Sequence, residues 1–104
     1  MQSADDTGYL TIARFSGDGD RLLATYRRFA DVMSGVGADH GLLAHAAAKT
    51  GDGFVIVNLW PSKAHSEAAA ADDRRLRVLE QIGIGPQEMN HEHHDAARIE
   101  VFGR

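Results

Sequence analysis

The sequence predicts a small α+β domain whose elements follow one another in the order β-α-β-β-α-β. The chain has 104 residues, which is enough for one domain. Residues 9–15 and 54–60 are rich in the β-branched and aromatic residues that favour strands, and two other stretches carry apolar residues at helical spacing. We expect one folded domain over residues 8–104, preceded by a flexible tail at residues 1–7.

In the first half of the chain, residues 9–15 predict a strand, and the polar, glycine-containing stretch 16–20 ends it. The next apolar residues follow at intervals of four, three and four, which predicts a helix over residues 21–33. These residues are Leu22, Tyr26, Phe29 and Met33. Asp18 or Asp20 can cap the start of this helix, and Gly35 and Gly37 are expected to end it.

In the second half, residues 42–49 and 54–60 predict two antiparallel strands joined by a hairpin turn at 50–53, whose glycines tolerate positive φ. Ser62 is a candidate N-cap for a second helix that continues to Ile82, with a kink or break at residues 72–73. The stretch 83–86 ends that helix. Residues 88–102 contain three histidines and end in an alternating pattern, 98–102, that predicts the last strand.

This order of elements predicts a ferredoxin-like βαββαβ fold: a four-stranded antiparallel sheet with two helices on one face. The strand at 54–60 carries large apolar residues on both faces, whereas a strand with one solvated face alternates apolar and polar residues. A second copy of the chain is the simplest cover for the other face. We therefore expect a homodimer.

Composition excludes several classes of protein. The formal net charge is −4 and acids interrupt the basic stretch at 72–77, so we expect no nucleic-acid partner. There is no cysteine, which excludes disulfides and thiolate chemistry. The apolar stretches are too short to cross a bilayer, and the N-terminus does not resemble a secretory signal. We expect a cytoplasmic protein with no membrane partner.

The chain resembles the dimeric α/β-barrel superfamily, which includes antibiotic-biosynthesis monooxygenase-like proteins. The resemblance rests on the strand 9–15, the helix start at 17–20, the hairpin at 50–53, and the strand end 57–60 that runs into Ser62. It implies that two sheets pack face to face into a barrel, with strand four of one subunit extending towards strand two of the other. It also implies a pocket between each sheet and its helices. Members include cofactor-independent oxygenases and heme-degrading enzymes.

Asn58, Trp60 and His65 are the first candidate site, because members of this superfamily use these residue types around the pocket. Few bulky side chains occur at 64–71, and this predicts a cavity over Asn58 and Trp60 with His65 at its rim. The resemblance implies a monooxygenase-like protein that binds a small molecule and oxidises an aromatic or polyketide-like substrate without a cofactor. His65 is then the expected catalytic base, with Asn58 and Trp60 positioning the substrate.

Three further residues, Tyr26, Arg14 and Ala69, are expected to contact the substrate. A plainer interpretation also stays open: Trp60 is a core residue, Asn58 bonds a neighbouring loop and His65 is solvated.

His91, His93 and His45 are the second candidate site. His91 and His93 share a strand face, and neutral imidazoles bind divalent transition metals. His45 of a partner subunit would approach them if strand four meets the partner's strand two. The alternative function is thus a non-catalytic binding or interaction module, with a histidine-rich metal site at the dimer interface. A heme-binding or heme-degrading protein is a further alternative, although the second helix has alanines where heme-degrading members carry the heme-binding histidine.

Overall fold

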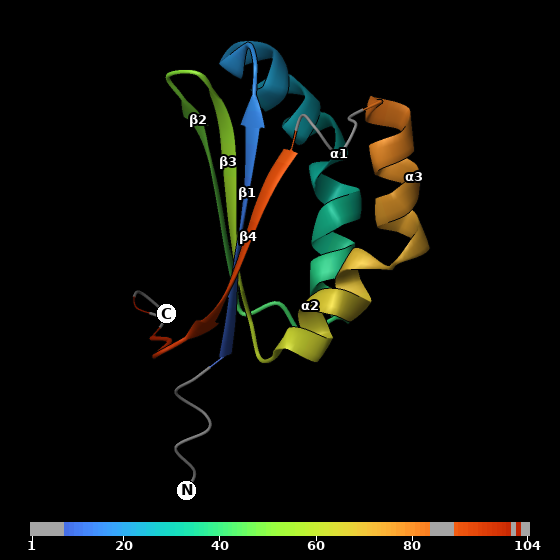
Figure 1. Ribbon diagram of the computed structural model, residues 1–104. Coiled ribbons are helices and arrows are strands. Elements are labelled where there is room, and N and C mark those ends of the chain that lie inside the picture. The colour runs from blue at the N-terminus through green and yellow to red at the C-terminus, as the bar shows by residue number, and fades with distance from the viewer. Residues whose placement is uncertain (1–7, 84–88, 101, 103–104) are drawn as a thin grey trace, which may run out of the picture.

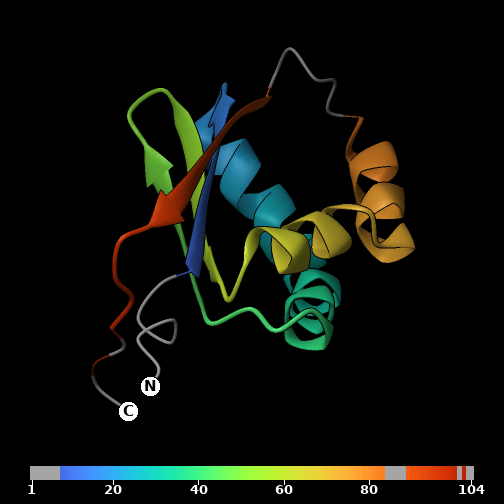
Figure 2. The ribbon, with the colours of Figure 1, turned by 60° about the horizontal axis from the view of Figure 1, so that its bottom comes forward.

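The computed structural model describes residues 8–83, 89–100 and 102, and the expected tail at residues 1–7 lies outside them. In chain order the elements are β1 (Gly8–Ser16), α1 (Gly19–Asp39), β2 (Ala44–Thr50), β3 (Gly53–Trp60), α2 (Lys63–Ala70), α3 (Asp73–Ile82) and β4 (Met89–Ala96). The strands form one antiparallel sheet in the order β2-β3-β1-β4. All three helices lie on one side of this sheet (Figures 1 and 2). The predicted ferredoxin-like fold is confirmed.

The hairpin between β2 and β3 sets the register of the sheet. Thr50 pairs with Gly53, which leaves a two-residue turn, Gly51 and Asp52. Neither Gly51 nor Gly53 adopts a positive φ, so the turn does not require one. Gly53 is needed for another reason: a side chain there would collide with the carbonyl oxygen of Phe15 on β1. Glycine at this position therefore permits close approach of two backbones.

Helix α1 is longer than predicted, because it continues through Gly35 and Gly37 to Asp39. The extension places Val36, which is only 2% exposed, in the core. Gly37 lets the returning chain approach, since a Cβ there would lie 2.7 Å from Cδ2 of Leu42. The left-handed residue that follows the helix is Gly41, with φ of +78°. Packing of the last turn thus outweighs the low helix propensity of the two glycines.

The second helical stretch is divided into α2 and α3, as the acidic pair at 72–73 suggested. Ser62 caps α2, because its side chain accepts a hydrogen bond from the backbone N–H of His65 at 3.2 Å. Asp72 caps α3 in the same way by accepting from Arg74 N at 2.9 Å. Gly83 adopts a left-handed conformation and ends α3. The remaining residues of the predicted stop, 84–86, lie outside the described residues.

The last strand lies earlier than predicted, because β4 is formed by the preceding, histidine-bearing segment, and of the predicted stretch 98–102 the residues 98–100 and 102 are not in a strand while 101 lies outside the described residues. The ladder between β1 and β4 runs from Phe15 paired with Met89 to Gly8 paired with Ala96. Ala96 therefore lies opposite the first residue of β1, and the ladder ends there. Arg98, Ile99 and Glu100 have no regular structure.

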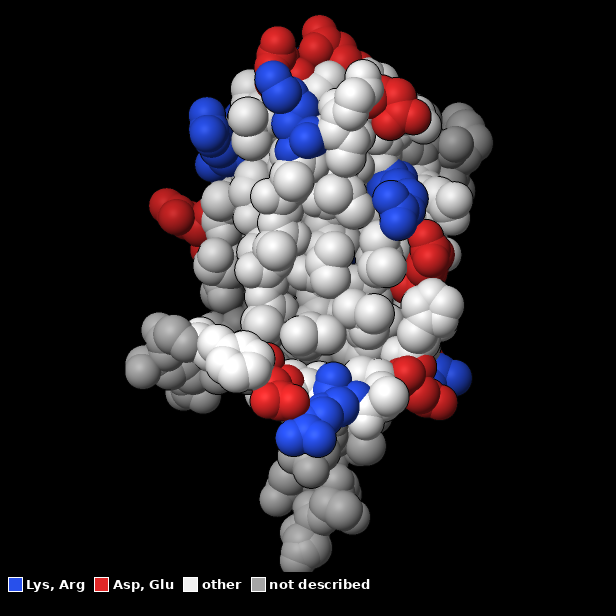
Figure 3. All heavy atoms as spheres, turned by 90° about the vertical axis from the view of Figure 1, so that its left-hand side faces the viewer, with Lys and Arg blue, Asp and Glu red and all other residues white. Residues whose placement is uncertain are grey.

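The two faces of the sheet differ in what covers them. The helix-covered face contributes Tyr9 and Trp60 to a core that also contains Val36 and Ala69. The opposite face has uncharged residues at its centre and charged residues towards its margins (Figure 3). Its half-exposed apolar residues are Leu10, Ile12, Val55, Val57 and Leu59. None of the helices in the described part of the chain is long and apolar enough to span a bilayer.

Candidate functional site

A cavity of about 760 Å³ lies between the sheet and its three helices. Its walls are mostly apolar and include the predicted stripe of α1. Small side chains on α2, Ser66 and Ala69, line it opposite the strands, as the alanine-rich sequence of this helix suggested. The predicted cavity over Asn58 and Trp60 is therefore present.

A polar row crosses the floor of this cavity on all four strands. Asn58 on β3 pairs with His45 on β2 and with Thr11 on β1, and Thr11 pairs in turn with His93 on β4. Paired residues in a sheet present their side chains on the same face, and all four line the cavity. The fold thus places two histidines at opposite edges of one cavity floor.

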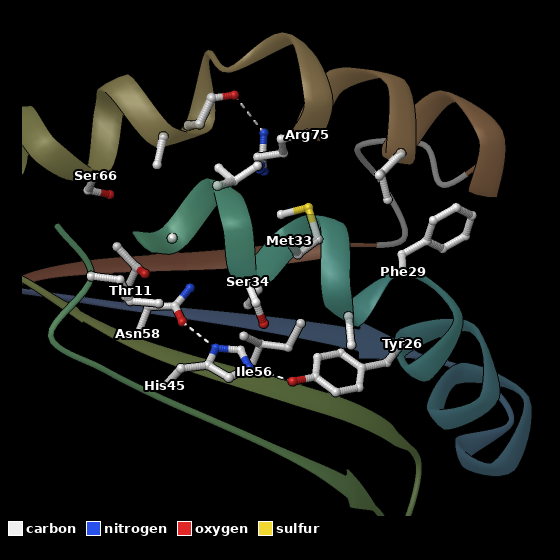
Figure 4. A pocket seen from close by; sticks show the side chains of 18 of the residues that line it. Thr11, Tyr26, Phe29, Met33, Ser34, His45, Ile56, Asn58, Ser66 and Arg75 are labelled. Atoms are coloured by element: carbon white, nitrogen blue, oxygen red, sulfur yellow. Dashed lines mark hydrogen bonds between the residues drawn. The ribbon is translucent and has the colours of Figure 1, made fainter. Parts of the chain in front are cut away.

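Three side chains form a continuous hydrogen-bonded chain at the β2 edge. The Tyr26 hydroxyl lies 2.5 Å from Nε2 of His45, and Nδ1 of His45 lies 2.6 Å from Oδ1 of Asn58. Figure 4 shows the three side chains in line, with the amide nitrogen of Asn58 turned away from His45. The rings of Tyr26 and His45 are nearly parallel, at an interplanar angle of 8°.

This arrangement determines the tautomer of His45. Oδ1 of Asn58 can only accept, so Nδ1 of His45 carries the proton and donates it. Nε2 then holds a lone pair and accepts from the Tyr26 hydroxyl. A histidine whose second nitrogen is held by an acceptor has the arrangement found in general-base catalysis. His45 lies on an edge strand and is exposed, so this base is reachable from solvent.

The other end of the cavity carries a positive charge. Arg75 projects from α3 and donates to the backbone carbonyl of Ala70 through Nη1 at 3.0 Å (Figure 4). Burial lowers the pKa of the Arg75 guanidinium, which nevertheless stays charged at neutral pH. His91 on β4 lies in the same part of the site. Burial, the Arg75 charge and His93, in that order of importance, lower the pKa of His91.

The cavity brings together four of the six residues predicted for catalysis and substrate binding: Asn58, Trp60, Tyr26 and Ala69. His65 does not line it. Its Nδ1 lies 2.6 Å from the Ser62 hydroxyl, and the residue borders a shallow depression next to His40 and Gly41.

Arg14 is also elsewhere, because it lies on the opposite face of the sheet. There its Nε donates to Oε2 of Glu92 at 3.1 Å. That hydrogen bond, together with one from His94, lowers the pKa of the Glu92 carboxyl. Trp60 is 5% exposed and its Nε1 donates to Thr11 at 3.4 Å, so it is a core residue as well as a wall of the cavity.

The histidines predicted to bind metal are divided between the two sheet edges. His91 and His93 share a face, with ring centroids 5.7 Å apart, as expected. His45 is at the far edge, and both its nitrogens are engaged. Within the described residues, no three His, Asp or Glu side chains form a set that could hold a metal ion. A site combining all three histidines would need a second chain and stays a prediction.

Two features of the site were not predicted from the sequence: His45 as a candidate base, and Arg75 as the positive charge of the cavity. The sequence nevertheless contains a signal for each. The hairpin pairs Thr50 with Gly53, and counting back along both strands pairs His45 with Asn58. Arg75 precedes Val78, Leu79 and Ile82 at spacings of three, four and seven, which places it on the apolar face of α3 rather than on the solvated one.

Comparison with solved structures identifies the class of fold. SnoaB, a cofactor-independent oxygenase from Streptomyces nogalater, matches with a TM-score of 0.58 and 14% identity, covering 96% of this chain and 99% of that one. NE2512, a protein of unknown function from Nitrosomonas europaea, matches with a TM-score of 0.72 and 15% identity over 96% and 99%. A structure described as an antibiotic biosynthesis monooxygenase matches with a TM-score of 0.67 and 16% identity over 86% and 98%.

These similarities show that the chain has the ferredoxin-like fold of antibiotic-biosynthesis-monooxygenase-like structures, the fold of the dimeric α/β-barrel superfamily. At such identities they bear on the fold and not on activity. No protein-family model matches the sequence, and no curated protein matches it.

Proposed function

We propose that the protein binds a small aromatic or polyketide-like molecule in its cavity and oxidises it with O₂ without a cofactor. The observation that carries this proposal is the hydrogen-bonded chain Tyr26–His45–Asn58 at the edge of an apolar cavity. An apolar cavity with a few convergent polar groups is the usual form of a small-molecule site. The oxygenases that share the fold support the same reaction class by analogy.

The chemistry begins with removal of a proton from the substrate. A substrate with an acidic C–H or O–H donates to the oxygen of Tyr26, and the Tyr26 proton passes to Nε2 of His45. Asn58 keeps Nδ1 protonated and holds the ring in place while the imidazolium exists. His45, rather than His65, is therefore our candidate base, because His65 does not reach the cavity.

The deprotonated substrate is electron-rich and reduces O₂ itself. A C–O bond forms to give a peroxide on the substrate carbon. The proton held on His45 is returned to the outer oxygen of the peroxide, the O–O bond breaks, and the remaining C–H proton leaves with that oxygen as water, so the original CH₂ carbon becomes C=O. The reaction consumes one O₂ and releases one H₂O, so the substrate supplies all of the electrons. The apolar walls contribute by excluding water from the anion.

Oxygen uptake with 1,8-dihydroxyanthrone tests this proposal, because oxidation of its methylene group yields a quinone with a distinct visible spectrum. We expect the protein to accelerate uptake and His45→Gln to reduce that acceleration about 100-fold or more. His65→Gln is the matched control and should retain the wild-type rate. No acceleration by the wild-type protein, or full activity in His45→Gln, would contradict the proposal.

The uncovered face of the sheet supports a homodimer as the working form. Its apolar centre and charged margins suit a second copy of the chain better than water (Figure 3). We expect sedimentation analysis to give a dimer mass for the wild type and for Glu80→Lys on α3. Val57→Glu, at the centre of the apolar face, should give a monomer. A monomeric wild type would refute the dimer.

A metal-loaded binding module is the second candidate, favoured by the proximity of His91 and His93 on one edge strand. Two imidazoles on one strand can supply half of a tetrahedral zinc site, and His45 of a partner subunit could add a third ligand. Calorimetric titration with Zn²⁺, with His91→Ala and His93→Ala as comparisons, separates this function from the first. The metal-binding function would be supported if the wild-type protein bound Zn²⁺ stoichiometrically and each of the two variants did not.

A further inference from the structure

Arg75 is the one permanently charged side chain among the described residues that line the cavity, and that lining contains no Asp or Glu. A guanidinium has five N–H donors, and the described contacts of Arg75 occupy one of them, on the carbonyl of Ala70. A charge taken from water into apolar surroundings is costly unless it is paired. The end of the cavity at α3 therefore suits an anion.

The neighbours of Arg75 contrast with those of the other arginines nearby. Arg74, the preceding residue, forms ion pairs with Asp39 and Asp72 on the outside of the helices. Arg77 is exposed. Of these three arginines only Arg75 lines the cavity, together with apolar residues of α1 and α3 and the histidines of β4. His91 and His93 add imidazole N–H donors at the same end.

We infer that the ligand of this cavity is an aromatic carboxylic acid, with its carboxylate on Arg75 and its oxidisable ring at Tyr26 and His45. This inference deepens the function proposed above, since it rests on the cavity being the ligand site but not on the oxidation. Guanidinium and carboxylate match geometrically and form paired hydrogen bonds. A neutral polyketide would leave the Arg75 charge without a partner.

The dimensions of the sheet limit the size of this acid. His45 and His91 lie on the two edge strands, β2 and β4, with β3 and β1 between them. Three strand spacings separate the edges, about 14 Å in all. A fused system of about three rings carrying a carboxyl group at one end would extend from the base towards the cation. Phe54, Phe15 and Phe29 also line the cavity and suit such a ring system.

Binding of anthraquinone-2-carboxylate, compared with its neutral carboxamide, tests the inference. Both compounds are anthraquinones and so are already oxidised. Their binding therefore does not depend on whether the protein is an oxygenase. We expect quenching of Trp60 fluorescence to show the carboxylate binding at least 10-fold more tightly than the carboxamide. Arg75→Met, which keeps an apolar side chain of similar length, should abolish this preference.

Two further variants make the result specific. Arg75→Lys should retain most of the preference, because it keeps the charge, and Arg77→Met should bind as the wild type does. Equal affinities for the two compounds in the wild-type protein, no binding of either, or a preference that survives in Arg75→Met would each overturn the inference. A preference for the carboxylate without oxygen uptake from an anthrone that carries a carboxyl group would uphold the ligand class and refute the oxidation.

Discussion

The hydroxyl of Tyr26 lies 2.5 Å from Nε2 of His45, and this hydrogen bond connects helix α1 to the edge strand β2. The two rings are nearly parallel, at an interplanar angle of 8°. On the far side of His45, Asn58 accepts from Nδ1. Each member of the chain comes from a different element, so the site exists only in the folded domain.

Replacement of Tyr26 by Phe tests whether the hydroxyl carries the proton. The ring, which also packs 5.2 Å from that of Phe54, is kept, and only the oxygen is lost. We expect the rate of anthrone oxidation to fall by about 10²- to 10⁴-fold, the usual contribution of a general acid or base. Tyr9→Phe, which changes a core tyrosine outside the cavity lining, should keep the wild-type rate. An unchanged rate in Tyr26→Phe would show that His45 accepts the substrate proton without it.

The sequence allowed the fold to be predicted because its strongest signals are local. The strand at 54–60, the N-cap at Ser62 and the apolar stripe of α1 each act within a few residues, and all three are confirmed. The last strand was placed too late in the chain. Residues 98–102 alternate as a strand should, but the ladder with β1 ends at Ala96. Pairing depends on where the partner strand begins, which composition does not reveal.

The site was only partly predictable, for a similar reason. Asn58 and Trp60 stand at the end of a clear strand, and the small residues of α2 predicted the space above them. His65 looked equally suitable, but Ser62 caps the helix and also holds its ring at the surface. His45 became a candidate base only through its contacts with Tyr26 and Asn58, which lie 19 and 13 residues away in sequence.

Gly35 and Gly37 should respond in opposite directions to replacement by alanine. A Cβ at Gly35 would meet Nη1 of Arg74 at 3.6 Å, an ordinary contact, so Gly35→Ala should stabilise the protein by about 0.5–1 kcal/mol through helix propensity. A Cβ at Gly37 would lie 2.7 Å from Leu42 Cδ2, so Gly37→Ala should destabilise it. Urea unfolding of the two variants measures the difference. Stabilisation by Gly37→Ala would mean that Leu42 moves aside freely.

Asp72 should make the stability of the protein sensitive to acid. Hydrogen bonds from Arg74 and then from His40 hold the pKa of the Asp72 carboxyl far below its usual value of 3.8. The folded state stabilises the ionised Asp72 carboxylate more than the unfolded state does. The resulting contribution to the free energy of unfolding is present above about pH 4. The contribution is lost as the pH falls below that value towards the lower pKa of the folded state.

Asp72→Asn isolates this charge, because asparagine caps a helix as well as aspartate does. We expect the variant to have a lower urea midpoint than the wild type at pH 7, and the gap to narrow as the pH falls from 4 to 2. Asp73→Asn, one residue further into α3, is the control and should change the midpoint little. A gap of the same size at pH 7 and pH 2 would show that the carboxylate charge is not the cause.

The imidazole of His91 should report on the charge at the far end of the cavity. Burial lowers its pKa most, Arg75 comes second and His93 third. Removing the Arg75 cation favours the imidazolium, so Arg75→Met should raise the pKa of His91 in an NMR titration of its ring protons. Because the pKa of His91 is lower in the folded protein, the unfolded chain protonates this imidazole more readily below about pH 6.5. His91 therefore lowers the free energy of unfolding as the pH falls below that value. Arg75→Met should weaken that dependence, and an unmoved His91 titration in this variant would place Arg75 too far away to influence the imidazole.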